Sequence, residues 1–233
     1  MRHNISLEIH KVFLRLMLAC LGTKSLADSM KNPFCKPAEY WKEIKTMNKS
    51  HLRVRALTEG AIMVALAFVL SFVKFMELPN GGSLTPAMFP ILLYALRWGL
   101  GRGLTAGFVF GLLQLMFDGA YAWGWQSMVL DYLLAFTPLG LSGLFRGKAW
   151  GIFPGTVVGC VCRFVIHYIS GVTIYRIIEP TAIPGLGTFD NAHVYSLVYN
   201  GSYMLPNMLL ALAIAGVLYV PLKKFLAGAD IRK

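Results

Sequence analysis

The chain has 233 residues, of which 56% are hydrophobic and only 14% are charged. Soluble domains usually carry about 25% charged residues, so this composition argues against an ordinary soluble fold. The net charge of +11 would suggest a nucleic-acid partner in a soluble protein. Here the basic residues fall between apolar runs of about 17–25 residues, the length that crosses a bilayer. We therefore expect an all-α membrane protein with no nucleic-acid partner.

Residues 1–50 differ from the rest of the chain because they are rich in charge, with nine Lys or Arg residues and four acids. Their apolar patch, Val12–Leu21, has about ten residues and is too short to span a bilayer. A signal peptide also places basic residues ahead of an apolar patch, but Arg15 interrupts this one and no clear cleavage site follows. We interpret residues 1–50 as a basic cytoplasmic extension, or as a mis-assigned start ahead of Met47, and residues 51–233 as the membrane domain.

Six apolar segments follow, and each predicts a transmembrane helix because lipid-exposed backbone has no water to satisfy its polar groups. They run from Ala56 to Met76, Pro86 to Leu96, Leu104 to Phe117, Met128 to Phe145, Ile152 to Tyr175 and Tyr195 to Leu222. The second is short. Strict two-residue alternation is absent, which argues against a membrane barrel.

The charges between these segments predict the orientation of the chain. One side carries one acid, Asp230, and eleven basic residues: Lys49, Arg53, Arg55, Arg97, Arg102, Arg146, Lys148, Lys223, Lys224, Arg232 and Lys233. The opposite loops carry Lys74, Arg176, Glu77, Asp118, Glu179 and Asp190. Because basic loops stay in the cytoplasm, we expect both termini on the cytoplasmic side, which agrees with an even number of spans.

Small residues at four-residue spacing let helix backbones approach closely. The sequence has two such rows, Ala61/Ala65 in the first segment and Gly99, Gly103, Gly107 and Gly111 around the third. Packing within the bundle is one interpretation of these rows. The other is a docking groove for a second membrane subunit.

Polar residues inside the spans are costly to bury and usually functional. The set comprises Asp131 in the fourth segment, Arg163, His167, Gly171 and Tyr175 in the fifth, and Tyr195 and Asn200 in the sixth. The members of the fifth segment are four residues apart and therefore line one stripe of a helix. Most of the set lies in the outer half of the membrane, whereas Arg163 lies nearer the middle.

Two interpretations fit this set. In one, Asp131 and Arg163 form a buried pair that fixes helix register. In the other, the set lines a water-accessible cavity open to the outside. Aromatic residues crowd the same level: Tyr121, Trp123, Trp125, Tyr132, Tyr168 and Tyr175. A carboxylate, an imidazole, an amide and aromatic rings together suit a flat, polar, cationic heterocycle.

The sequence contains neither a phosphate-binding G-x-x-x-x-G-K-[ST] loop nor a G-x-S-x-G or H-E-x-x-H motif. Its four cysteines, Cys20, Cys35, Cys160 and Cys162, lack metal-site spacing. We therefore expect no catalytic residues, no metal and no cofactor. An intramembrane enzyme that uses Asp131 and His167 as an acid/base pair is the alternative from another functional class. The turn-rich outer loop at residues 79–86 fits either a mobile lid or an ordinary turn.

Several groups of residues carry a resemblance to a known family. They are Leu57-Thr58-Glu59 with Ala61 and Ala65; Gly81-Gly82-Ser83 with Phe89-Pro90-Ile91 and Leu96-Arg97-Trp98-Gly99; Leu130-Asp131-Tyr132 with Gly140–Phe145; Arg163 with His167–Gly171; and Tyr195-Ser196-Leu197 with Tyr199-Asn200. With these residues, the chain from about Leu52 to Leu226 resembles the thiamine-specific S component of energy-coupling-factor (ECF) transporters, of the ThiT/YuaJ type.

The resemblance implies a six-helix S-component bundle in a bacterial plasma membrane. It implies that the bundle binds thiamine from outside and works with a membrane coupling subunit (T component) and two cytoplasmic ATPase subunits. Docking of the coupling subunit would use Ala61 and Ala65. Substrate contacts would come from Asp131, Tyr132, Tyr121, Arg163, His167, Gly171, Tyr175, Tyr195 and Asn200.

The chain departs from some members of that family at these positions. Asp131 stands where some have Glu, Arg163 where some have Lys, and Tyr175 where some have Trp. The Gly81-Gly82 pair stands where some have another Trp. A shorter acid and a different stacking ring leave the choice of ligand open among thiamine, its phosphates and its precursors, and an S component for a related vitamin is the alternative within this class.

Overall fold

The structure is a computed structural model that describes residues 37–78, 81–118, 124–174 and 189–231, together with residues 183, 185 and 187. The chain divides after Val54 into two compact units, and the second, Arg55–Lys233, contains the helical bundle. Residues 1–36 lie outside the described residues. The interpretation of residues 1–50 as a basic extension therefore stays a prediction.

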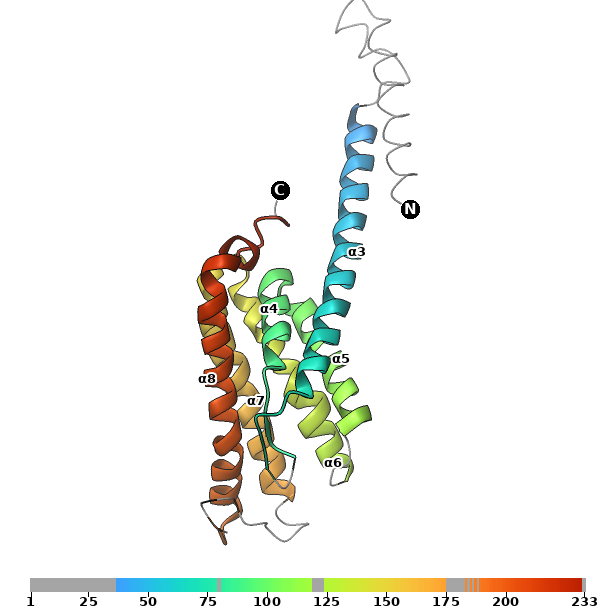
Figure 1. Ribbon diagram of the computed structural model, residues 1–233. Helices are drawn as coiled ribbons and strands as arrows, with labels where there is room; N and C mark the ends of the chain where they lie inside the picture. The colour runs from blue at the N-terminus through green and yellow to red at the C-terminus, as the bar shows by residue number, and fades with distance from the viewer. Residues whose placement is uncertain are drawn as a thin grey trace, which may run out of the picture. The chain divides into compact units, whose positions relative to one another are not determined.

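Helices make up nearly all of the described chain (Figure 1). In chain order the elements are α3 (Pro37–Ser71), β1 (Met76–Glu77), β2 (Ser83–Leu84), α4 (Met88–Trp98), α5 (Leu100–Asp118), α6 (Trp125–Ser127), the π-helix η2 (Met128–Leu134), the 3-10 helices η3 (Thr137–Phe145) and η4 (Ala149–Gly151), α7 (Ile152–Ile174) and α8 (Ala192–Leu226). Each of the six predicted apolar segments contains helix, so the all-α prediction is confirmed.

Five helical segments of the described chain are long and apolar enough to cross a membrane. They are Ser50–Ser71, Leu100–Phe117, Trp125–Phe145, Ala149–Ile174 and Ala192–Leu226. The sixth helix, α4, has 11 residues, all of them buried. Its length of about 16 Å is roughly half the hydrocarbon thickness of a bilayer. Helices α5, α7, α8 and η3 pack around it, so α4 forms an apolar centre for the bundle.

A short hairpin replaces the end that was predicted for the first span. The prediction extends this span to Met76, but α3 ends at Ser71. Beyond it, Met76–Glu77 pairs antiparallel with Ser83–Leu84. The predicted boundary is therefore wrong, because apolar composition alone does not distinguish the end of a helix from the hairpin segment that follows it.

The side-chain amide of Asn207 on α8 holds this hairpin. Its Oδ1 accepts a hydrogen bond from the Thr85 backbone N–H at 3.0 Å, and its Nδ2 donates to the Ser83 carbonyl at 2.7 Å. Asn207 is 4% exposed. Non-helical backbone at membrane depth is tolerated where the protein itself satisfies the polar groups. The amide does this for the strand that leads into α4.

The glycine row of α5 packs within the bundle. A Cβ atom on Gly107 would meet the carbonyl oxygen of Phe136, and one on Gly111 would meet the carbonyl oxygen of Tyr132. A Cβ atom on Gly103 would collide with Ala95 of α4. Only glycine allows this approach between backbones. The packing interpretation is confirmed for these three glycines.

Candidate functional site

The carboxylate of Asp131 lies between two side chains inside the bundle. Ser127 Oγ donates to Asp131 Oδ2 at 2.7 Å, and His167 Nδ1 lies 3.0 Å from Asp131 Oδ1. The side chains of Asp131 and His167 are only 20% and 10% exposed. An ionised carboxylate has about four acceptor sites, so these two bonds leave capacity for a further donor or a cation.

Local backbone geometry positions Asp131. It lies on the π-helix η2, between the short α6 and the 3-10 helix η3. A proline stands in the first turn of η3, and because Pro138 has no backbone N–H, it cannot donate to a regular α-helical ladder. Single π-helical turns are rare and occur frequently at functional sites. Ser127 precedes Asp131 by four residues, so the two side chains meet on one side of the helix.

His167 connects Asp131 to Arg163. Arg163 Nε lies 3.4 Å from His167 Nε2. Arginine nitrogens only donate, so His167 Nε2 is the acceptor, and the ring proton then resides on Nδ1 and is donated to Asp131. The guanidinium carbon of Arg163 lies 4.1 Å from the centre of the Phe136 ring. The acid of η2 and the base of α7 are therefore joined through a neutral imidazole, in place of the direct Asp131–Arg163 pair.

Asn200 holds α8 against α7 beside this group. Its Nδ2 donates to the His167 carbonyl at 3.2 Å and to Ser196, whose carbonyl and Oγ lie at 2.9 and 3.1 Å. Its Oδ1 accepts from the Tyr203 hydroxyl at 3.0 Å. Gly171 lies so close to Ser196 and Asn200 that a Cβ atom has no room there. Because its amide bonds to protein groups on both sides, Asn200 supports the backbone of His167.

A ladder of tyrosines continues along α8. Tyr195 and Tyr199 stack with ring centres 5.8 Å apart, and Tyr203 lies edge-on to Tyr199. The Tyr203 ring also lies edge-on to His167, at 6.3 Å. The three tyrosines form one buried cluster with Leu78 of the hairpin segment. The hairpin segment, through Leu78, and His167 therefore contact the same cluster of tyrosines.

Comparison with known proteins then identifies the chain. The profile of the family described as "Thiamine transporter protein (Thia_YuaJ)" matches residues 57–227. The chain belongs to the thiamine transporter family. The resemblance seen in the sequence is therefore confirmed, and the matched region begins within the first helical segment and extends just past the end of the sixth.

Individual proteins that are similar to this chain are also named as thiamine transporters. The protein named thiamine transporter ThiT from Bacillus subtilis is 32% identical over 195 residues, which are 77% of this chain and 97% of that protein. ThiT from Lacticaseibacillus paracasei is 31% identical over 201 residues, 78% of this chain and 95% of that protein. The solved structure of ThiT from Listeria monocytogenes superposes with a TM-score of 0.65 at 27% identity, over 75% of this chain and 98% of that one.

The structure brings together five of the residues predicted to contact substrate: Asp131, Arg163, His167, Gly171 and Asn200. Tyr132 is buried, and Tyr195 belongs to the aromatic cluster. Tyr121 and Tyr175 lie outside the described residues. The predicted docking residues Ala61 and Ala65 are both exposed on α3.

Three polar residues at this site were not predicted from the sequence: Ser127, Tyr203 and Asn207. Ser127 and Tyr203 carry spacing signals, because they lie four residues before Asp131 and three after Asn200 on helices. Asn207 lies one further turn along α8 from Tyr203, and its role depends on a hairpin that the sequence does not predict. Among the described residues, no group of three His, Cys, Asp or Glu side chains is placed to hold a metal ion.

Proposed function

We propose that this chain is the high-affinity thiamine-binding S component of an ECF-type, ATP-driven vitamin importer. One observation carries the proposal: a mostly buried carboxylate, Asp131, is held by Ser127 and His167 in a member of the thiamine transporter family. The proteins named as thiamine transporters match this chain over nearly their whole length.

The chemistry of the site suits thiamine. Thiamine combines an aminopyrimidine, which offers an exocyclic amine, with a cationic thiazolium ring. The remaining acceptor capacity of Asp131 suits the amine, and a carboxylate at low dielectric attracts a cation strongly. The tyrosine rings near His167 offer faces to aromatic and cationic groups. Arg163 balances the charge of Asp131 before the ligand enters.

Partners and orientation complete the proposal. The exposed Ala61 and Ala65 would meet a membrane coupling subunit, since small residues permit close helix contact. Two cytoplasmic ATPase subunits would supply the energy. The excess of basic residues at one end of the bundle supports cytoplasmic termini and substrate entry from the opposite side.

The test is a titration of the purified full-length protein with thiamine, followed by quenching of its tryptophan fluorescence. Saturable binding is expected, and Asp131→Asn should weaken it by about 10–150-fold, because a hydrogen bond to a charged group contributes about 1.5–3 kcal/mol. Asp190→Asn is the matched control, since Asp190 is exposed and precedes α8.

A competition experiment distinguishes among the candidate ligands, since the sequence does not decide among them. Thiamine phosphate and the hydroxymethylpyrimidine precursor are added to the thiamine complex in turn. Tighter binding of either compound would move the assignment to that ligand. Failure of folded protein to bind any of the three would overturn the proposal, and turnover of a ligand by purified protein would favour the intramembrane enzyme.

A further inference from the structure

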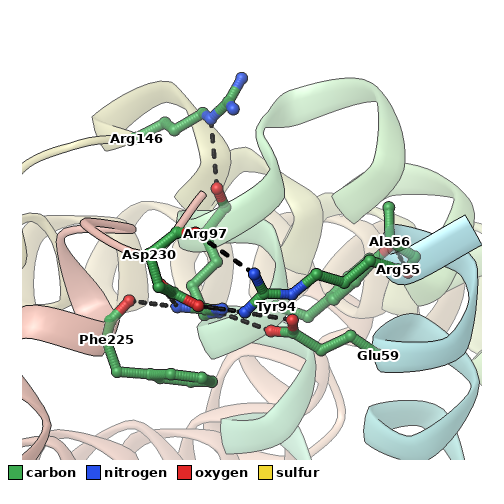
Figure 2. Close-up of polar contacts among 8 residues, drawn as sticks. All are labelled: Arg55, Ala56, Glu59, Tyr94, Arg97, Arg146, Phe225 and Asp230. Carbon is green, nitrogen blue, oxygen red and sulfur yellow. Dashed lines mark hydrogen bonds and ion pairs between the residues drawn. The ribbon is translucent and has the colours of Figure 1, made fainter. Parts of the chain in front are cut away.

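A fully enclosed arginine lies at the end of α4, away from the Asp131 site. Arg97 is 1% exposed. Its Nε and Nη2 donate to the two carboxylate oxygens of Glu59 at 2.5 and 3.2 Å. Its Nη1 and Nη2 donate to the two carboxylate oxygens of Asp230, each at 3.2 Å. Nη1 also donates to the Phe225 carbonyl at 2.5 Å. These five contacts use the five N–H donors of a guanidinium (Figure 2).

The C-terminal turn carries Asp230 to this position. The backbone N–H of Gly228 donates to the Phe225 carbonyl at 2.9 Å, and that of Ala229 donates to the Lys224 carbonyl at 3.1 Å. This pair of bonds is a Schellman motif, which ends α8 and reverses the chain. Gly228 has φ of 64°, which glycine adopts without strain. The reversal turns Asp230 back toward the bundle.

Helix α3 supplies the other side of the network. Arg55 donates to the carboxylate of Asp230, and Glu59 is held by Arg97 as above. The hydroxyl of Tyr94 on α4 donates to the Ala56 carbonyl at 2.9 Å. The charges of Arg55 and Arg97 balance those of Glu59 and Asp230 in a cluster that joins α3, α4 and the C-terminal turn. Arg146 Nε adds a hydrogen bond to the backbone carbonyl of Arg97 at 3.1 Å. Figure 2 shows Arg97 between Glu59 and Asp230.

In its last turn, α3 meets α5 through the Phe68 and Phe117 rings, whose centres are 4.9 Å apart, and through a hydrogen bond from Ser71 Oγ to Gln114 at 3.3 Å. Between Ala56 and Ser71 the buried residues all have short side chains: Ala56, Gly60, Val64, Ala67 and Ser71. Small side chains make few directional contacts with a neighbouring helix, whereas a bidentate arginine–carboxylate pair has a defined geometry. Residues 59 and 61 are about 200° apart around a helix. A clamp on Glu59 therefore directs Ala61 and Ala65 away from the bundle, where the structure has them exposed.

We propose that Arg97 is a positioning residue that clamps α3, through Glu59, to the C-terminal turn, through Asp230, and thereby presents Ala61 and Ala65 to the membrane coupling subunit. The presentation step rests on the proposed function. The clamp itself does not, because it involves only residues of this chain. Buried ion pairs contribute little net stability but can select one arrangement of helices, which is the role assigned here.

The test measures the position of α3 in the full-length protein. The four native cysteines are replaced by alanine, and spin labels are attached to Leu57→Cys and Val217→Cys, at positions 74% and 77% exposed. Pulsed electron paramagnetic resonance then gives the distance distribution between α3 and α8. Glu59→Gln and Asp230→Asn should broaden or shift this distribution, and Asp230→Glu should restore it. Asp190→Asn should leave it unchanged.

Two further readouts separate the steps. Thiamine affinity should stay as in the parent protein, because Arg97 contacts Glu59, Phe225 and Asp230, whereas Asp131 contacts Ser127 and His167. Co-purification with the coexpressed coupling subunit and ATPases should fall about fivefold or more, the range of a coupling free energy above 1 kcal/mol. Unchanged distances in both Glu59→Gln and Asp230→Asn would overturn the clamp. Changed distances with full co-purification would overturn the presentation step. If the parent protein binds no thiamine but the two variants still change the distances, the proposed ligand is refuted and the clamp is supported.

Discussion

His167 Nδ1 lies 3.0 Å from Asp131 Oδ1 and joins α7 to the π-helical turn of the fourth helix. Because Arg163 contacts the other ring nitrogen, the imidazole has one tautomer and one orientation. The carboxylate is thereby aimed before any ligand arrives. Preorganised polar groups of this kind reduce the ordering cost of binding.

Replacing His167 should weaken ligand binding. His167→Ala removes the donor that orients Asp131, and we expect thiamine to bind about 10–150-fold more weakly, the range for a hydrogen bond to a charged group. Fluorescence titration measures the effect. His193→Ala is the matched control, because His193 is exposed and contacts the Tyr168 hydroxyl at the surface. Equal affinities for His167→Ala and the parent protein would contradict the role of His167.

Enlarging Gly171 should separate α7 from α8. The Cβ atom of Gly171→Ala would collide with Ser196 and lie 3.1 Å from Asn200 Nδ2. Overpacking of this kind costs about 1–3 kcal/mol, so the thermal unfolding temperature should fall. Gly201→Ala on α8 meets nothing within 4 Å and serves as the control. A Gly171→Ala protein that unfolds at the temperature of Gly201→Ala would refute the close contact.

Removing the Asn207 amide should release the hairpin. Asn207→Ala leaves the Thr85 N–H and the Ser83 carbonyl without their partners, at about 1–3 kcal/mol for each buried group. Hydrogen exchange across residues 76–85 should therefore accelerate. Asn191→Ala provides the comparison, since Asn191 caps the start of α8 by accepting from His193 N and Val194 N. In Asn191→Ala, hydrogen exchange should accelerate at the start of α8 and not in the hairpin. Hairpin exchange in Asn207→Ala as slow as in the parent protein would contradict the anchoring role of Asn207.

Acid should loosen the C-terminal turn through Asp230. Hydrogen bonds from the Arg97 guanidinium hold the pKa of Asp230 below its ordinary value, with a smaller contribution from Arg55. A carboxyl whose folded pKa is depressed stabilises the fold fully above its unfolded pKa of about 3.9, and the contribution is lost as pH falls through the folded value. The charged groups around the Asp230 carboxylate are Arg97 and Arg55, which bond to it, and Glu59, which bonds to Arg97.

The measurement compares unfolding temperatures of the parent protein and Asp230→Asn from pH 7 to pH 3. The parent should be more stable at pH 7, and the difference should shrink below about pH 4. The difference will be modest because the Asp230 side chain is 40% exposed and solvent screens it. A difference that stays constant across this range would show that ionisation of Asp230 does not contribute.

Much of the candidate site is accessible from sequence, because burial in lipid makes polar residues conspicuous. Asp131, Arg163 and His167 were predicted from their depth in apolar segments, and the structure brings them together. The direct Asp131–Arg163 pair was one interpretation, and the imidazole between them was not foreseen. Helical spacing places residues on a face, but it does not say which neighbour across the interface each one contacts.

The sequence by itself determined six apolar helical segments, since the thickness of a bilayer sets their length and lipid excludes unpaired backbone. It placed Arg97 among the loop charges. Only the tertiary structure decided that Arg97 is buried, because its two carboxylate partners come from residues 38 and 133 positions away. The hairpin after Ser71 was likewise decided by Asn207, more than 120 positions along the chain. A buried charged side chain, or a buried backbone group without a partner in its own segment, is stable only when distant segments bring partners to it. Local composition does not encode which distant segments come together.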